Sequence, residues 1–334
     1  MSNPVLVEVL RGGIVESRHR GAVFVCGPDG TAVLEIGDTA RPVFPRSAVK
    51  AIQALPLVET GTADAYAFGK RELALACASH TGEAMHTELA ASMLARAGLD
   101  QRALECGSHW PFNHDAFVAL ARSGKEPNAL CNNCSGKHSA FLCTCVHEGI
   151  DHKGYVAAGH PFQEMVRKTM QEVTGAVHDA GNAAIDGCSI PTYAVPLTAL
   201  AQGFARMATG EGLAPGRARA ARRLLDACMA EPLLVSGTGK ADAALMQAAP
   251  GRIFTKVGAE GVYCAAVPEL GLGIALKCDD GAERGTESMV AAVLAKLLAA
   301  DKDVAARLTD IANAPIRSRI GATVGGLRPT AALA

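Results

Sequence analysis

The stretch Phe44-Pro45-Arg46-Ser47-Ala48-Val49-Lys50-Ala51-Ile52-Gln53-Ala54-Leu55 lies where the chain changes from predicted strands to predicted helices. Apolar residues stand at every third position from Val49 to Leu55, which is the spacing of one helix face. We therefore expect a helix from Ser47 to Leu55 that ends at Pro56, because proline rarely continues a helix. This junction decides the fold, since the two sides of it follow different periodicities.

Short runs rich in β-branched residues lie upstream of this junction, and they predict strands at Val5–Leu10, Ala22–Cys26 and Thr31–Ile36. The last two runs are separated by Gly27-Pro28-Asp29-Gly30, a composition typical of a hairpin turn. Strands return late in the chain, with predicted spans of Arg252–Val257, Gly261–Val267 and Gly273–Cys278.

The region between these two groups of strands has helical spacing, and most of its segments are closed by glycine. The predicted helices are Glu83–Ala97, His114–Ser123, Gly136–Glu148, Pro161–Thr174, Pro196–Ala208 and Pro215–Ala230. A last helix is predicted over Glu283–Ala300, and Gly321–Leu327 lies in a weakly patterned tail.

Strands, many helices, strands and a final helix form the order expected when both chain ends build one sheet. We predict an α/β (α+β) fold in which an antiparallel sheet from both chain ends is flanked by helices, with a helical lobe beside it. The chain shows no internal repeat and no low-complexity linker. Residues 1–334 are expected to form a single two-lobed domain, with a sheet lobe of about 1–70 and 235–334 and a helical lobe of about 71–234.

Composition excludes several classes of function. The formal net charge is −1, so there is no electrostatic reason to expect nucleic acid or an anionic membrane as a partner. Charged residues interrupt the amino terminus and no long apolar run follows, which predicts neither a signal peptide nor a membrane span. The protein is expected in the cytoplasm, where thiols stay reduced. Most of the 11 cysteines, such as Cys26, Cys143 and Cys264, are then expected to be buried apolar residues.

Ser47 and Lys50 are the first candidates for chemistry. Residues three apart on a helix share a face, so the Lys50 amine can lie near the Ser47 hydroxyl. A lysine whose pKa is lowered by burial could take the serine proton and so activate a nucleophile. The pair alone is weak evidence, because a helix cap followed by a surface lysine gives the same pattern.

Two further segments offer a hydroxyl and a cation. Ser79 and His80 stand among small residues that would let a substrate approach the backbone. A capping turn would explain this segment equally well. The segment Thr255–Gly261 connects two predicted strands, so Lys256 would project from a sheet edge near a glycine turn. The segment Ser236-Gly237-Thr238-Gly239-Lys240-Ala241-Asp242 fails as a phosphate loop, because Leu234 and Ala241 replace required residues. We interpret it as a turn at the rim of the site.

Cysteine spacing suggests a metal site. Cys131, Cys134 and His138 have the spacing of thiolate and imidazole ligands, and Cys188 could be a remote fourth ligand. Only one CxxC pair exists, so a zinc finger is not expected, and buried thiols beside a helix start remain an alternative.

Several motifs occur in a fixed order: Ser17-Arg18-His19-Arg20-Gly21, Pro45-Arg46-Ser47-Ala48-Val49-Lys50, Ser79-His80-Thr81-Gly82-Glu83, Cys134-Ser135-Gly136-Lys137-His138, Asp186-Gly187-Cys188, Ser236-Gly237-Thr238-Gly239 and Lys256-Val257-Gly258-Ala259-Glu260-Gly261. Together they resemble the bacterial L-asparaginase II family of rhizobial type. The resemblance covers most of the chain. The sequence departs from the family pattern at Lys240, where arginine would be expected. It implies a fold like that of serine β-lactamases, penicillin-binding proteins and glutaminases.

The resemblance also implies roles for residues. Ser47 with Lys50 would form one Ser-Lys pair, and Ser79 with Lys256 a second one nearby. One serine would attack the amide carbon of L-asparagine, release ammonia and leave an acyl-enzyme that water hydrolyses to aspartate. We favour Ser47 as the nucleophile, because its base lies on the same helix turn.

The family site further implies a zinc ion, with ligands matching Cys134, Lys137 and Cys188. Spacing alone favours His138 over Lys137, and we follow the family. The residues expected to bind substrate, or to orient it and the zinc ligands, are Arg46, His80, Asp186 and His138. Family members are expected to form homodimers.

Two other functions stay open. A glutaminase or another β-lactamase-like amide hydrolase would use the same Ser-Lys chemistry. A zinc- or redox-sensing protein built on Cys131, Cys134 and Cys188 would need none of it.

Overall fold

One antiparallel sheet is built from both ends of the chain, as predicted. The computed structural model describes residues 2–333. The sheet has eight strands in the order β6-β7-β8-β2-β1-β10-β9, and β3 pairs with β2 beside this path. The strands are β1 (Val5–Arg11), β2 (Ile14–Cys26), β3 (Ala32–Ile36), β6 (Phe254–Gly258), β7 (Val262–Val267), β8 (Leu272–Cys278), β9 (Pro315–Arg317) and β10 (Thr323–Pro329).

The predicted hairpin between β2 and β3 is confirmed, with Val23 opposite Ile36 and Cys26 opposite Ala32. However, β2 begins at Ile14 rather than at Ala22. Its first half alternates between exposed and partly buried residues and pairs with β1, whereas its second half is buried and pairs with β8. The sequence pattern revealed only the apolar half.

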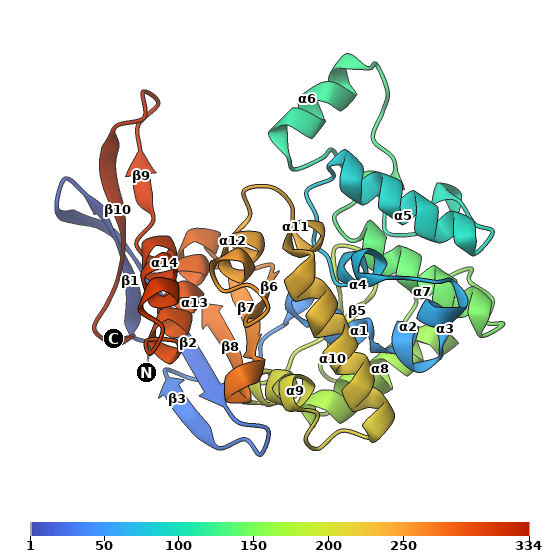
Figure 1. The fold of residues 1–334 in the computed structure, drawn as a ribbon, viewed down its shortest axis with the longest axis horizontal. Helices are drawn as coiled ribbons and strands as arrows, with labels where there is room; N and C mark the ends of the chain where they lie inside the picture. The colour runs from blue at the N-terminus through green and yellow to red at the C-terminus, as the bar shows by residue number, and fades with distance from the viewer. Residues whose placement is uncertain (1, 334) are drawn as a thin grey trace.

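The sheet separates two hydrophobic cores. Alternate residues of β2 point to opposite faces, so Ala22 and Phe24 join one core while Val23 and Val25 join the other. Helix α9 (Leu197–Thr209) packs on β2, β7 and β8 from one side. Helices α13 (Glu283–Leu297) and α14 (Lys302–Ala312) cover the other side (Figure 1).

The middle of the chain is helical, and most of its helices gather beside the sheet in Figure 1. The six predicted middle helices are confirmed as α5 (Ala84–Arg96), α6 (His114–Arg122), α7 (Ser135–His147), α8 (Pro161–Thr174), α9 and α10 (Pro215–Ala230). The shorter helices are α3 (Thr62–Ala65), α4 (Lys70–Ala76), α11 (Pro232–Val235) and α12 (Ala241–Ala248), and β4 (Ala183–Ile185) pairs with β5 (Pro191–Tyr193).

The prediction for the helix that follows the first strands was wrong. The single helix expected from Ser47 to Leu55 is a 3₁₀ turn η1 (Arg46–Val49), then α1 (Lys50–Gln53) and α2 (Leu55–Glu59). Pro56 does not end a helix but stands in the first turn of α2, where a missing N–H costs nothing. The weakly patterned tail after α13 contains α14 and β10. These two elements bury Leu308 and Leu327 in the core that α13 covers.

All 11 cysteines are free and buried. Cys26, Cys143 and Cys264 are fully buried in the core, as predicted. Within residues 2–333, no helix is long and apolar enough to cross a bilayer.

Candidate active site and metal centre

Ser47 stands on a tight turn that is pressed against the edge strand of the sheet. The turn η1 packs on β6, and Gly258 of β6 makes this possible. A side chain at Gly258 would conflict with the Pro45 carbonyl oxygen and would come within 3.2 Å of Ala48. Arg46 has a φ of +53°, a conformation that costs a non-glycine residue free energy. The residue directly before Ser47 is therefore held in a strained backbone by its surroundings.

Lys50 is 1% exposed, and its ammonium group reaches the end of α4 rather than Ser47. Lys50 Nζ donates to Ser79 Oγ at 2.9 Å, to the Ala78 carbonyl at 2.5 Å and to Cys134 Sγ at 3.1 Å. Within residues 2–333 no hydrogen bond joins Lys50 to the Ser47 hydroxyl. The predicted pair of Ser47 with Lys50 is thus replaced by a contact between Lys50 and Ser79.

Burial lowers the pKa of Lys50, and the ammonium groups of Lys137 and Lys256 lower it further, against the opposing effect of Cys134. A lysine with a lowered pKa is more easily neutral, and only a neutral amine can accept a proton. The environment of Lys50 therefore suits a general base that faces Ser79.

Lys256 is paired differently from the prediction. Its ammonium lies 3.3 Å from Asp242 Oδ2 and 3.0 Å from the Val257 carbonyl, and no hydrogen bond within the described chain joins it to Ser79. Asp242 also accepts from the Val257 backbone N–H and from the Tyr263 hydroxyl. The side chains of Lys256 and Asp242 are both fully buried. The carboxylate of Asp242 is thus fully occupied by hydrogen-bond donors of the protein. These contacts hold α12 against the edge strand β6.

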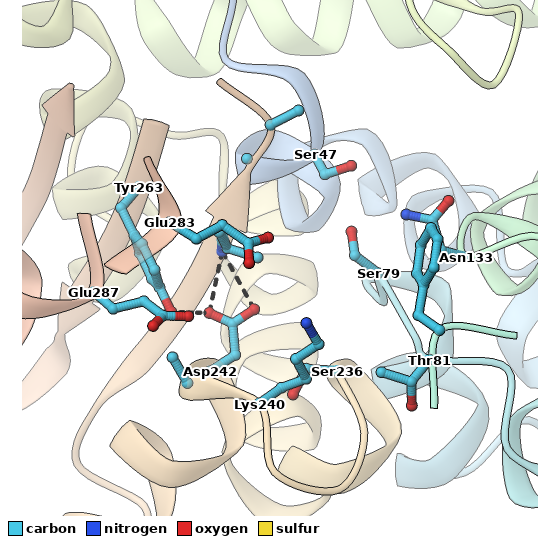
Figure 2. Close-up of a pocket in the computed structure, with 15 residues that line it drawn as sticks. Ser47, Ser79, Thr81, Asn133, Ser236, Lys240, Asp242, Tyr263, Glu283 and Glu287 are labelled. Atoms are coloured by element: carbon cyan, nitrogen blue, oxygen red, sulfur yellow. Dashed lines mark hydrogen bonds between the residues drawn. The ribbon is translucent and has the colours of Figure 1, made fainter. Parts of the chain in front are cut away.

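A cavity of about 270 Å³ lies between the two serines and this buried pair. Figure 2 shows Ser47 and Ser79 on one side of the cavity and Asp242, Tyr263, Glu283 and Glu287 on the other. The lining residues are Ser47, Ser79, Thr81, Phe112, Asn133, Ser236, Lys240, Ala241, Asp242, Val257, Gly258, Ala259, Tyr263, Glu283 and Glu287. This volume lies just below the range of about 300–1,000 Å³ that is typical of small-molecule pockets, so the cavity suits a small substrate.

The loop from Ser236 to Lys240 forms one wall of this cavity, in agreement with its interpretation as a turn at the rim. Glu83 holds the loop in place by accepting from the Thr238 backbone N–H at 3.0 Å and from its hydroxyl at 2.7 Å. Sequence reasoning missed Glu283 and Glu287. They stand four apart at the start of a predicted helix, so they share a face, but nothing in the sequence says which cavity that face meets.

The metal ligands implied by the resemblance lie together on the far side of Lys50. Lys137 Nζ is 3.2 Å from Cys188 Sγ, and the Cys188 thiol hydrogen-bonds the sulfur of Cys134. That hydrogen bond, together with the Lys50 and Lys137 ammonium groups, overcomes burial and holds the pKa of Cys134 well below its usual value. A thiolate is the form of cysteine that binds metal.

Cys131 and His138 do not join this cluster. The Cys134 sulfur has hydrogen bonds with Lys50 and Cys188. Within residues 2–333, the one group of three or more clustered His, Cys, Asp or Glu ligand atoms is that of His19, Cys278 and Asp280, so neither Cys131 nor His138 forms such a group with Cys134. His138 Nδ1 lies 2.7 Å from the Tyr155 hydroxyl, and its buried Nε2 has no partner. The geometry therefore favours the donor set with Lys137 over the one that spacing alone suggested.

The residues predicted to bind substrate lie around the centre without lining the cavity described above. Arg46 Nε donates to Asp186 Oδ1 at 2.6 Å, which ties the Ser47 turn to the segment that carries Cys188. His80 is 1% exposed, is 2.8 Å from the Ser135 hydroxyl and stacks on His86. Burial lowers the pKa of His80 and of His138 well below the usual value, so both rings are neutral.

Several solved structures are similar to this chain at low identity. A β-lactamase (Mb2281c) from Mycobacterium bovis is 15% identical, with 80% of this chain and 89% of that chain covered and a TM-score of 0.38. The native form of Mglu is 16% identical, with 80% of this chain and 62% of that chain covered and a TM-score of 0.43. D-alanine carboxypeptidase AmpC from Burkholderia cenocepacia is 12% identical, with 86% and 92% covered and a TM-score of 0.41.

No curated protein matches the chain in sequence. The model of the L-asparaginase II family, in contrast, matches residues 7–329, nearly the whole chain. That span contains Ser47 and Ser79, the three buried lysines Lys50, Lys137 and Lys256, and the paired cysteines Cys134 and Cys188. The protein belongs to the L-asparaginase II family, which makes it an amidohydrolase.

Proposed function

We propose that this protein is an L-asparaginase that hydrolyses the side-chain amide of L-asparagine to L-aspartate and ammonia. The observation that carries the proposal is the 2.9 Å contact between the buried Lys50 amine and Ser79 Oγ, at a cavity that Ser47 also lines. A hydroxyl within hydrogen-bond reach of a base is the arrangement that nucleophilic catalysis requires. Membership of the family supplies the reaction class.

In the proposed mechanism, neutral Lys50 accepts the proton of Ser79. A serine oxygen then adds to the amide carbon, the C–N bond breaks as ammonia takes up a proton, and an ester remains on the enzyme. Water hydrolyses this ester and regenerates the serine. The same lysine can return the proton to the leaving amine, since a base in one step acts as an acid in the reverse transfer.

The contact with Lys50 favours Ser79 as the hydroxyl that loses its proton directly. Ser79 would then attack the amide itself, or it would pass a proton from Ser47 to Lys50 while Ser47 attacks. Mass spectrometry of the acyl-enzyme trapped with a slow amide analogue distinguishes the two, because the added mass falls on the peptide that carries the nucleophile. Lys256 supports either route, since its positive charge contributes to the lowered pKa of Lys50.

The donor set at Cys134, Cys188 and Lys137 fits the zinc ion that the family implies. Two sulfurs and an amine that lie within hydrogen-bond reach of one another in the core are ligands that zinc accepts, and the low pKa of Cys134 favours the charged form. Bound zinc would supply a fixed positive charge for orienting the substrate. His138 and Asp186 are proposed to orient these ligands or the substrate. Arg46 and His80, which hydrogen-bond Asp186 and Ser135, are proposed to hold the segments around the substrate in place.

The experiment that tests the proposal is an ammonia-release assay with purified, zinc-loaded protein on L-asparagine, L-glutamine and a chromogenic β-lactam. The highest kcat/KM is expected for L-asparagine. Release from glutamine alone would instead identify a glutaminase, and no release from asparagine would overturn the proposal. Size-exclusion chromatography with light scattering tests the proposed homodimer, and localisation of a tagged chain tests the proposed cytoplasmic location.

A sensing function predicts the opposite response to substitution. If the cysteine cluster served as a zinc or redox sensor, Ser47→Ala and Ser79→Ala would leave its readout intact, whereas Cys188→Ala would abolish it. An asparaginase should lose several orders of magnitude in rate when its nucleophile is removed.

A further inference from the structure

Three charged side chains that line the cavity have no hydrogen-bonding partner in the described part of the chain. The side chains of Lys240, Glu283 and Glu287 all line the cavity, and within residues 2–333 none of them forms a hydrogen bond or ion pair. The neighbouring Asp242, in contrast, is fully engaged by Lys256, Val257 and Tyr263. The unpartnered groups are therefore available to a ligand, whereas Asp242 is not.

A buried hydroxyl in the same wall also has no partner. Ser236 is 2% exposed and lines the cavity, yet its Oγ makes no hydrogen bond. A buried polar atom without a partner destabilises the fold, so such atoms usually meet a ligand or water. Because Ser236 lies in the same loop as Lys240, we expect the ligand to carry hydrogen-bonding groups on this side of the cavity.

The signs of the charges identify the kind of ligand. Figure 2 shows the Lys240 side chain reaching up between Asp242 and Ser79, with Glu283 and Glu287 across the cavity. One cation near Ser79 and two carboxylates across the cavity from it complement a molecule that carries both a carboxylate and an ammonium group. The α-carbon of a free amino acid carries this combination, and its side-chain amide would extend toward the serines.

We propose that Lys240 binds the α-carboxylate of the substrate and that Glu287, with Glu283, binds its α-ammonium group. This inference rests on the proposed amide hydrolysis for the direction in which the side chain points. It also explains why the enzyme would select a free amino acid. An amide without an α-carboxylate would leave Lys240 unpaired, and one without an α-ammonium group would leave Glu287 unpaired. Ser236 donates a further hydrogen bond to the bound carboxylate.

Substrates that lack one group at a time test the proposal. Succinamic acid lacks the α-amino group, and 3-aminopropanamide lacks the α-carboxylate. We expect the wild type to prefer L-asparagine over each by about tenfold or more in kcat/KM, since each truncated substrate loses one charge-assisted hydrogen bond. Glu287→Gln should abolish the preference over succinamic acid only, and Lys240→Met the preference over 3-aminopropanamide only.

Matched controls separate recognition from structure. Glu88→Gln and Lys302→Met change exposed helix residues of the same types and should keep both preferences. Lys240→Arg keeps the charge and should keep the preference over 3-aminopropanamide. The proposal is overturned if Glu287→Gln lowers the rates with asparagine and succinamic acid equally, or if it changes neither.

A binding measurement separates this inference from the proposed reaction. L-aspartate carries both α-groups and requires no turnover, so its affinity can be measured by calorimetry. If the protein releases no ammonia yet Lys240→Met and Glu287→Gln each weaken aspartate binding about tenfold or more, the reaction is wrong and the subsite stands. If ammonia is released but neither substitution affects aspartate binding or substrate preference, the subsite is wrong and the reaction stands.

Discussion

Lys50 Nζ and Ser79 Oγ lie 2.9 Å apart, although 29 positions separate the two residues in the sequence. The contact joins the turn that follows the first strands to the segment after α4. It places a buried amine, whose pKa is lowered by burial, directly against a cavity hydroxyl. The hydroxyl and the amine should therefore act as one unit.

Because Ser79 and Lys50 act together, substitutions of the two residues should have strongly non-additive effects on kcat. Ser79→Ala and Lys50→Met should each lower kcat by about a thousandfold or more, and the double variant should be little worse than either single one. Single-turnover ammonia release measures the rates, and circular dichroism checks folding. Effects that multiply in the double variant would contradict the assignment, because they would show that the residues act independently.

The position of the Ser47 turn should depend on Gly258. A β-carbon there would conflict with the Pro45 carbonyl oxygen, so Gly258→Ala should shift the turn. We expect kcat to fall by about 100-fold, as for other small misplacements of reacting groups. Gly159→Ala, where a β-carbon meets open space, is the control. An unchanged kcat for Gly258→Ala would show that the exact position of Ser47 does not matter.

Zinc binding should depend on the tertiary partner of Cys134 and not on its neighbour in the sequence. Cys134→Ser and Cys188→Ser should each reduce bound zinc from about one per chain to a small fraction, because a serine hydroxyl is a poor zinc ligand. Cys131→Ser should retain the metal. Mass spectrometry of the metal content after dialysis makes the measurement. Loss of zinc from Cys131→Ser would instead show that Cys131 and Cys134 bind the metal together, as their spacing in the sequence suggests.

The buried pair of Lys256 and Asp242 should be essential for stability. Asp242→Asn leaves a buried ammonium without its counter-charge and should lower the free energy of unfolding by about 3–5 kcal/mol. The double variant Asp242→Asn with Lys256→Met should recover part of this loss, since it removes the unpaired charge. Urea unfolding of the wild type and the two variants tests the coupling. Equal losses in the single and double variants would show that the ion pair is not the cause.

Glu287 should make substrate affinity depend on pH near neutrality. Burial, together with the carboxylates of Glu283 and Asp242, raises the pKa of Glu287 to about 7, against the opposing effect of the Lys240 cation. Tyr263 also faces this group. Only the carboxylate form pairs with an ammonium group, so KM for asparagine should fall as pH rises through about 7. Glu287→Gln should flatten this dependence of KM on pH.

The same raised pKa has a consequence for folding. Between the unfolded value of 4.5 and the folded value of about 7, the folded state binds more protons than the unfolded state. Stability contributed by this group is therefore present below the unfolded value and is lost as pH rises through that window. Glu287→Gln should raise Tm more at pH 8 than at pH 4, and thermal unfolding at both values checks the sign.

Local pattern in the sequence determined the secondary structure of most segments and the types of residue available for chemistry. The hairpin at Gly27–Gly30, the helices of the middle region and the buried cysteines all follow from periodicity, turn residues and composition. These signals act over a few positions. They could not show that β2 extends to Ile14, where half-exposed residues dilute the pattern.

Only the tertiary structure decided which reactive groups meet. Spacing offered Ser47 as the partner of Lys50 and Cys131 as the partner of Cys134, and packing selected Ser79 and Cys188 instead. The reason is that a buried amine or thiol is stabilised by whatever polar group the folded core brings within about 3 Å, regardless of distance along the chain. The same reason kept Glu283 and Glu287 out of the predicted site, because the cavity that they line is closed by residues more than 200 positions earlier in the sequence.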